Sequence, residues 1–107
     1  ISVALAKENV FFDQQLALLL TLVDEKMSMR TACQHIQISY STGWNLLRRL
    51  ETELGRTLVA RSQGGHGGGQ SRLTEDGRLL LARYNEFERR LRAQTDLLFQ
   101  DCFGEVL

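Results

Sequence analysis

The chain has 107 residues, of which 43% are hydrophobic, and it carries 13 basic and 13 acidic side chains, so residues 1–107 have room for one domain with a modest core but not for two. Its apolar runs fall short of the roughly 18 residues that a membrane-spanning helix needs, and charges among its first ten residues are unlike a signal peptide, so we expect neither. The two cysteines are far apart and favour a reducing, cytoplasmic setting over a disulfide framework.

The formal net charge is zero, which would argue against a nucleic-acid partner if the charges were evenly spread. They are not evenly spread. Residues 28–74 hold six arginines and two glutamates, a balance of +4, whereas residues 1–27 and residues 75–107 each carry −2. Because phosphate binding depends on the local field, the middle of the chain is the segment that suits DNA.

The N-terminal part predicts a short strand followed by a helix. Residues 2–7 alternate weakly between apolar and small or polar side chains, which is typical of an edge strand. Asp13 is a candidate N-cap, and the helix after it carries an apolar stripe at the 3-and-4 spacing: Leu16, Leu19, Leu20 and Val23. We expect Phe11 and Phe12 to cover one end of the core.

A short helix is predicted from an N-cap at Ser28 to about Ile36, with Cys33 facing inward, and residues 37–39 then form a tight turn. A second, longer and more basic helix follows. Two helices joined in this way form the pattern of a helix-turn-helix over about residues 28–54. We interpret Cys33 as a small core residue, since no second pair of ligands completes a metal site with it.

The helix over residues 39–54 is the candidate recognition helix. Leu47, Leu50 and Leu54 share one face with Gly43, which leaves space for a neighbouring helix. The opposite face carries hydrogen-bond donors that are not acidic, which suits a helix in a major groove: Ser39, Ser41, Thr42, Asn45, Arg48 and Arg49. The acids Glu51 and Glu53 come only at the far end of the helix. Gly55 is expected to end the helix. An ordinary amphipathic helix with a solvated polar face is the alternative interpretation.

Residues 57–73 predict a β-hairpin wing. Two short apolar or β-branched segments, residues 57–61 and 71–73, flank a stretch with five glycines among residues 63–70. Glycine lets backbone N–H groups approach a phosphate closely. The wing residues expected to contact DNA are Gly64, Gly65, His66, Gly67, Gln70 and Arg72. A nucleotide-phosphate loop lacks its required sequence here, and a hairpin tip without a binding role is the remaining alternative.

A long final helix is predicted from an N-cap at Thr74 to about Phe103, roughly 45 Å at 1.5 Å per residue. Its heptad seam, interrupted by Gln94, predicts a partner helix, and its far end would extend past the first helix of the same chain. We therefore expect a homodimer. Its expected interface combines two leucines of the first helix with the seam: Leu16, Leu20, Leu80, Tyr84, Phe87, Leu91 and Leu98.

These segments together resemble the N-terminal domain of ModE-type, molybdate-responsive bacterial regulators, from about Val3 to Leu98. The resemblance is carried by the runs ISYSTGW (38–44), LVAR (58–61), GGHGGG (64–69) and LTEDG (73–77), with Leu80 and Tyr84. The run LETELGRTL (50–58) is also similar to the LysR-type winged helix. The resemblance implies a winged helix-turn-helix that binds a palindromic operator as a dimer. It also implies that Tyr40 approaches bases or nearby phosphates, together with Ser39, Ser41, Thr42 and Asn45. It leaves Trp44 open between DNA contact and core packing.

Full ModE-type regulators carry separate oxyanion-binding domains after this one, whereas this sequence ends at Leu107. We therefore expect no molybdate on this chain, and no cofactor or metal. The fold class predicted is mainly α with a small β-hairpin wing and a long C-terminal dimerisation helix. The function predicted is a sequence-specific DNA-binding regulator; a winged-helix module that binds another protein is the alternative. An enzyme is disfavoured, because the two histidines and two cysteines form no catalytic constellation.

Overall fold

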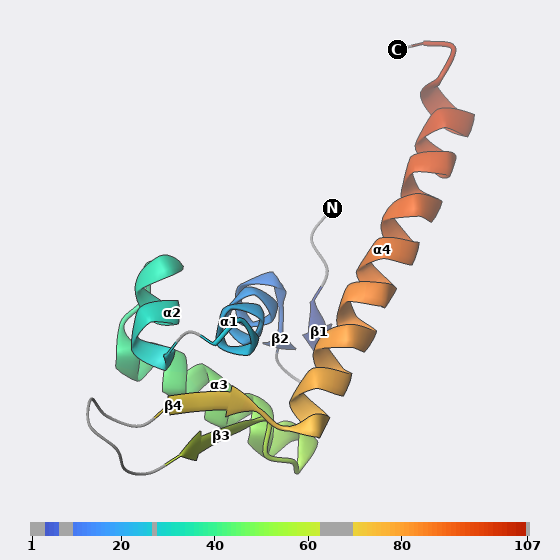
Figure 1. Ribbon diagram of the computed structural model, residues 1–107. Helices are drawn as coiled ribbons and strands as arrows, with labels where there is room; N and C mark the ends of the chain where they lie inside the picture. Colours follow the sequence, from blue (N-terminus) through green and yellow to red (C-terminus); the bar gives the residue numbers. More distant parts are fainter. Residues whose placement is uncertain (1–3, 7–9, 27, 63–69, 107) are drawn as a thin grey trace.

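The computed structural model of the protein describes residues 4–6, 10–26, 28–62 and 70–106. These residues form four helices and two small hairpins, and Figure 1 shows that the last of the four helices extends far from the rest. The elements in chain order are β1 (Leu5–Ala6), β2 (Val10–Phe12), α1 (Gln14–Asp24), α2 (Met29–His35), α3 (Tyr40–Leu54), β3 (Val59–Ser62), β4 (Gln70–Leu73) and α4 (Glu75–Phe103). The fold is a winged helix-turn-helix, as the sequence predicted.

The core is built around α1, which packs against α2, α3, β4 and the first half of α4. Its predicted stripe is buried, with Leu19 and Leu20 fully inaccessible to solvent. Phe12 is also fully buried and meets the ring of Tyr84 edge-on, with the ring centroids 4.7 Å apart. Phe12 therefore closes the end of the core, as expected.

Three residues that the sequence assigned to a dimer interface belong instead to the core of the protomer. Leu16, Leu20 and Tyr84 are at most 4% exposed, so they have no free surface to offer a second chain. The helical spacing of these residues was interpreted correctly, but the partner was wrong: α1 itself covers the first turns of α4.

The helix ends follow the local signals in the sequence. The side chains of Asp13, Ser28 and Thr74 each accept a hydrogen bond from the backbone N–H three residues on, which confirms the three predicted N-caps. Ser39 caps α3 in the same way and therefore lies just before the helix. Gly55 adopts a left-handed conformation with φ of 65° and ends α3, as predicted.

The wing strands pair in antiparallel register, with Val59 opposite Leu73 and Ser62 opposite Gln70. The first strand begins two residues later than the sequence predicted, because Thr57 lies in the connection from α3 and its carbonyl accepts a hydrogen bond from the Thr74 hydroxyl at 2.7 Å. At the N-terminus, the expected single edge strand is one half of a hairpin: β1 pairs with β2.

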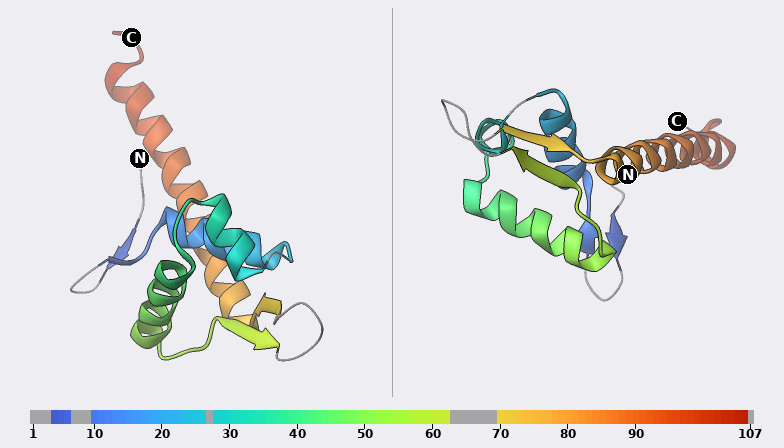
Figure 2. Two further views of the ribbon diagram at one scale, coloured as in Figure 1. Left: turned by 90° about the vertical axis from the view of Figure 1, so that its left-hand side faces the viewer. Right: turned by 60° about the horizontal axis from the view of Figure 1, so that its bottom comes forward.

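α4 makes the molecule elongated, with principal extents of 61 × 26 × 23 Å. Its buried residues, Gly77, Leu81 and Tyr84, all lie in its first ten residues. A Cβ at Gly77 would overlap the carbonyl oxygen of Leu58, so this glycine permits the close contact between α4 and the start of the wing. From residue 91 onward every residue of α4 is exposed except Thr95, which is half-buried. Figures 1 and 2 show this half of the helix standing clear of the other elements.

Candidate nucleic-acid interface

α3 presents its donors on one side and its apolar residues on the other. Gly43, Leu47 and Leu50 are buried. The exposed side holds the predicted DNA-contacting residues of this helix and its cap: Ser39, Ser41, Thr42, Asn45, Arg48 and Arg49. Tyr40, predicted with them, is half-buried. Over residues 39–49 the helix therefore offers a polar surface without an acid, of the kind that a major groove accepts, and the exposed acid of α3, Glu53, comes one turn after Arg49.

The start of α3 is held by α2. A Cβ at Gly43 would overlap the sulfur of Cys33, which is 1% exposed. Burial raises the pKa of the Cys33 thiol above its usual value, so the neutral thiol is favoured. Cys33 is therefore a core residue that sets the distance between the two helices of the helix-turn-helix.

The first turn of α3 is further ordered by hydroxyl groups. The Ser39 side-chain oxygen accepts a hydrogen bond from the backbone N–H of Thr42 at 3.1 Å. The Ser39 hydroxyl in turn donates to the Thr42 hydroxyl oxygen at 2.7 Å. The Ser41 hydroxyl lies 3.3 Å from Ser39. The Asn45 side chain makes no hydrogen bond to another described residue, so it is the neutral side chain of this face that is freest to bind a base edge.

Two arginines from other elements pack on the aromatic residues of α3. The guanidinium carbon of Arg61, in β3, lies 4.1 Å from the centroid of the Trp44 ring, and its Nη2 donates to the Tyr40 hydroxyl oxygen at 2.8 Å. On α2, Arg30 lies 4.6 Å from the centroid of the Tyr40 ring. The rings of Tyr40 and Trp44 meet edge-on with centroids 6.3 Å apart. These four residues are called the arginine–aromatic cluster below.

Arg61 was not among the site residues predicted from the sequence, and Trp44 was left open between DNA contact and core packing. The structure places Trp44 at the margin of the core: it is half-buried, and its Nε1 is buried without a hydrogen-bond partner among the described residues. A strand position 21 residues after Tyr40 carries no local signal that the two side chains will meet, so only the chain fold reveals the contact.

Glu51 connects the far end of α3 to the wing. Its Oε2 accepts from the backbone N–H groups of Leu58 and Val59, at 2.7 and 3.3 Å. This acid therefore points at backbone donors behind the exposed surface. Its negative charge is engaged by these two N–H groups.

On the wing, Gln70 and Arg72 lie on β4 and are exposed. The other predicted contacts of the wing, Gly64, Gly65, His66 and Gly67, lie outside the described residues. Figures 1 and 2 show the hairpin beside α3, so the two elements share one side of the molecule.

The electrostatics of this side are basic. Ion pairs within the described part of the chain engage Arg56, Arg78, Arg89 and Arg92. They do not engage the exposed arginines around α3 and the wing, which are Arg30, Arg48, Arg49, Arg61 and Arg72. Five positive charges without a carboxylate partner form a field that attracts phosphate.

Other chemistry is not supported by the described residues. Among them, no group of three histidine, cysteine or acidic side chains could hold a metal ion. No helix within these ranges is both long and apolar enough to cross a membrane.

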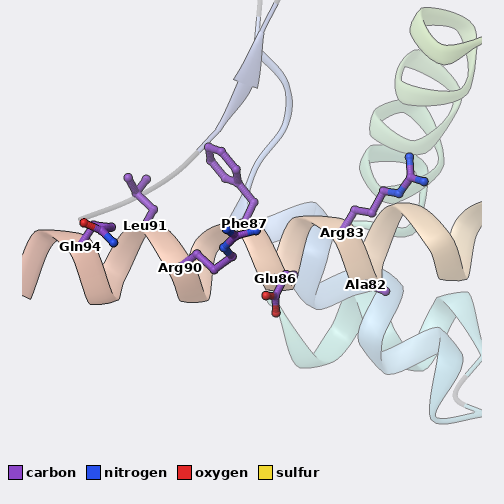
Figure 3. A pocket seen from close by; sticks show the side chains of 7 residues that line it. All are labelled: Ala82, Arg83, Glu86, Phe87, Arg90, Leu91 and Gln94. Atoms are coloured by element: carbon purple, nitrogen blue, oxygen red, sulfur yellow. The ribbon is translucent and has the colours of Figure 1, made fainter.

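The hollow in Figure 3 lies along the outside of α4 and is lined by Ala82, Arg83, Glu86, Phe87, Arg90, Leu91 and Gln94. Being open and formed by one helix, it resembles a packing surface more than an enclosed pocket for a small molecule.

Comparison with known proteins agrees with this geometry. Residues 14–78, more than half of the chain, match the model of the bacterial regulatory helix-turn-helix proteins of the LysR family. This chain belongs to the LysR family. The matched segment runs from α1 through the helix-turn-helix and the wing to the start of α4, and the LysR family comprises regulators of transcription that bind DNA, not enzymes.

The chain is also similar to three individual proteins. It is 29% identical over 80 residues to the molybdenum transport protein ModE of Azotobacter vinelandii, a match covering 75% of this chain and 30% of ModE. Among solved structures it is similar to the LysR-type regulator LysG of Corynebacterium glutamicum, with TM-score 0.58 and 26% identity over 86% of this chain. It is also similar to ArgP of Mycobacterium tuberculosis, with TM-score 0.50 and 31% identity over 85% of this chain.

The chain spans about 30% of the length of these relatives, since it covers 29% of both LysG and ArgP. The ModE match confirms the resemblance drawn from the sequence, and the LysR matches confirm the winged helix. By family, residues 14–78 are therefore a helix-turn-helix domain of the kind found in bacterial transcription regulators.

Proposed function

We propose that this LysR-family chain binds a two-fold symmetric operator as a homodimer and regulates transcription there. The observation that carries the proposal is the polar side of residues 40–49 of α3, which bears no acid and lies beside a wing whose exposed arginines, Arg61 and Arg72, form no ion pair with other described residues. Within that face, Asn45 and Thr42 are assigned to base edges, and Arg48, Arg49 and Arg72 to phosphates. Ser39, Tyr40, Ser41, the wing glycines, His66 and Gln70 complete the assigned contacts.

The homodimer is proposed from α4. Its exposed apolar residues include Phe87, Leu91 and Leu98, which are 53%, 36% and 63% exposed and follow the heptad seam. Figure 3 shows Phe87 and Leu91 projecting from the same side of the helix. An exposed apolar seam of this length favours a second copy of the helix as its cover. Leu80, half-buried against the core, would lie where that seam meets the protomer.

We place the regulator in the cytoplasm, where a bacterial operator is found, and we assign no oxyanion to this chain. The name of the ModE relative refers to molybdenum transport, but the match covers only 30% of that protein. Any molybdate chemistry of the relative therefore lies outside what the two proteins are known to share.

The test is a salt titration of binding to a pool of random duplex DNA, with recovery and sequencing of the bound fraction. The logarithm of the association constant should fall linearly with the logarithm of salt concentration, because phosphate contacts release counterions. The recovered sequences should share an inverted repeat, with half-sites about one helical turn apart. Absence of binding at low salt would contradict the proposal and favour a winged-helix module that binds another protein.

A further inference from the structure

The arginine–aromatic cluster joins three elements that would otherwise be free to shift relative to one another. Arg30 comes from α2, Tyr40 and Trp44 from the first turns of α3, and Arg61 from the first strand of the wing. β3 and α3 are joined here through side chains, since Arg61 of β3 contacts both Tyr40 and Trp44 of α3. The contacts of Arg61 are therefore a direct side-chain connection between the wing and the start of the recognition helix.

The chemistry of the cluster restricts how it can be arranged. A guanidinium group has donors and no acceptor, so in the 2.8 Å contact the Tyr40 oxygen must accept from Arg61. The tyrosine O–H proton is left able to donate. At the same time the planar guanidinium of Arg61 covers the Trp44 ring, an electrostatically favourable arrangement that a compact ammonium group would not reproduce with the hydrogen bond still in place.

Arg61 makes these two contacts although it is exposed, and it forms no ion pair in the described part of the chain. Its neighbours across the sheet do not hold it, since the residue opposite, Ser71, is uncharged. The two aromatic residues of α3 are thus the groups that fix its direction. Tyr40 in turn lies beside Ser41 and Thr42, which are assigned to DNA.

We propose that Arg61 is a positioning residue: through Tyr40 and Trp44 it fixes the wing at a set angle to α3, so that both bind DNA as one rigid unit. The inference rests on the proposed DNA binding. In this role Arg61 acts through the shape of its guanidinium group as well as through its charge. It also orients the Tyr40 hydroxyl so that this group can donate to a backbone phosphate.

The competing interpretation is that Arg61 is simply one more positive charge near the phosphates. The two roles differ in their response to lysine. Lysine preserves the charge and its counterion release but loses the planar stack and the directed hydrogen bond. A charge-only residue would tolerate the change, whereas a positioning residue would not.

The first experiment therefore compares Arg61→Lys with Arg72→Lys, its matched control. Arg72 is an exposed arginine of the other wing strand, and no aromatic ring of the described residues covers it. Affinity is measured by fluorescence anisotropy over a range of salt concentrations, on the duplex recovered from the random pool. Arg61→Lys should weaken binding about tenfold, with the slope against salt unchanged. Arg72→Lys should weaken it less than about threefold.

A second readout needs no DNA. Trp44 is the one tryptophan of the chain, so its fluorescence reports on the stack directly. Acrylamide, which is uncharged, should quench Trp44 more strongly in Arg61→Lys than in the wild type or in Arg72→Lys. Thermal unfolding of each variant, followed by circular dichroism, establishes that the helices are still folded at the temperature of both measurements.

Tyr40→Phe completes the test, because it removes the hydroxyl and keeps the ring. If Arg61 acts through Tyr40, the double variant Arg61→Lys/Tyr40→Phe should bind more tightly than the product of the two single effects predicts. The inference is overturned if the single effects multiply, if the two lysine variants behave alike, or if acrylamide quenching is unchanged. If the wild type binds no DNA, the proposed function fails, and the quenching result still decides whether the cluster exists.

Discussion

Gly43 of α3 and Cys33 of α2 lie so close that a side chain at Gly43 would overlap the cysteine sulfur. The two helices of the helix-turn-helix therefore approach at a distance that only glycine permits at this position. The same contact explains why Cys33 is small and buried rather than reactive. Two residues ten positions apart thus set the geometry from which the donors of α3 project.

Gly43→Ala should destabilise the fold by about 1–3 kcal/mol, because the cost of overpacking exceeds the gain in helix propensity. Unfolding in urea measures the change. Cys33→Ala is the matched second variant, since it removes the atom that the new methyl would meet. In the double variant the two changes should cost less than their sum, and an additive result would place the conflict elsewhere.

The Cys33 thiol should resist alkylation while the protein is folded. Burial restricts access to the sulfur and raises the pKa of the thiol, which lowers the fraction of reactive thiolate. Cys102→Ser removes the exposed cysteine, so that mass spectrometry after iodoacetamide treatment reports on Cys33 alone. Modification in urea but not in buffer is the expected pattern. Rapid modification of the folded chain would mean that the contact between α2 and α3 opens readily.

The interpretation of Asn45 as a base-reading residue makes a prediction about specificity. Asn45→Ala should cost about 1–3 kcal/mol on the recovered site and little on random duplex. Arg48→Ala is the comparison: as a phosphate contact it should weaken both DNAs and reduce the slope against salt. Gel-shift titrations on the two duplexes measure this. Equal weakening of both DNAs by Asn45→Ala would remove it from the base-reading residues.

The carboxylate of Glu51 should matter more for stability than for specificity. Replacing it with alanine leaves the N–H groups of Leu58 and Val59 without this acceptor, a loss of about 1–3 kcal/mol when such groups are buried. Glu51→Gln keeps an acceptor oxygen and should lose less. Urea unfolding of the three proteins gives the order. If the Glu51→Ala and Glu51→Gln variants had the same free energy of unfolding, the two hydrogen bonds would not be holding the start of the wing.

Local rules were sufficient for much of this fold. The caps at Asp13, Ser28 and Thr74 could be predicted because each side chain has an oxygen that accepts from the backbone N–H three residues on. The periodicity of α3 predicts which of its faces is buried. What the sequence could not give was the identity of distant partners. The stripe containing Leu16 and Leu20 predicts that other residues cover it, but not that they come from other elements of the same protomer, namely α2, α3, β4 and α4.

In the candidate site, too, local features could be predicted from the sequence and contacts between distant residues could not. The donors along α3 follow from helical spacing, whereas the contact of Arg61 with Tyr40 depends on how a strand and a helix 21 residues apart are brought together. Glu51 is similar: its charge was visible in the sequence, but the backbone groups that it binds become its neighbours only where the chain turns from the end of α3 into the wing.

The dimer seam of α4 can be tested with two adjacent residues. Leu97 and Leu98 are both 63% exposed, but they lie about 100° apart around the helix. Only Leu98 follows the seam of Phe87 and Leu91. Leu98→Glu would place a charge where two copies of the helix are expected to meet, and burying an unpaired charge in such an interface is strongly unfavourable.

Leu98→Glu should therefore shift the protein to a monomer in sedimentation velocity, whereas Leu97→Glu should remain a dimer. The monomer should also lose affinity for the inverted repeat while retaining binding to a single half-site, because the two half-sites are then no longer bound by one linked pair. If both variants stayed dimeric, the copies would meet through another surface. If both became monomeric, the interface would extend around the helix beyond the predicted seam.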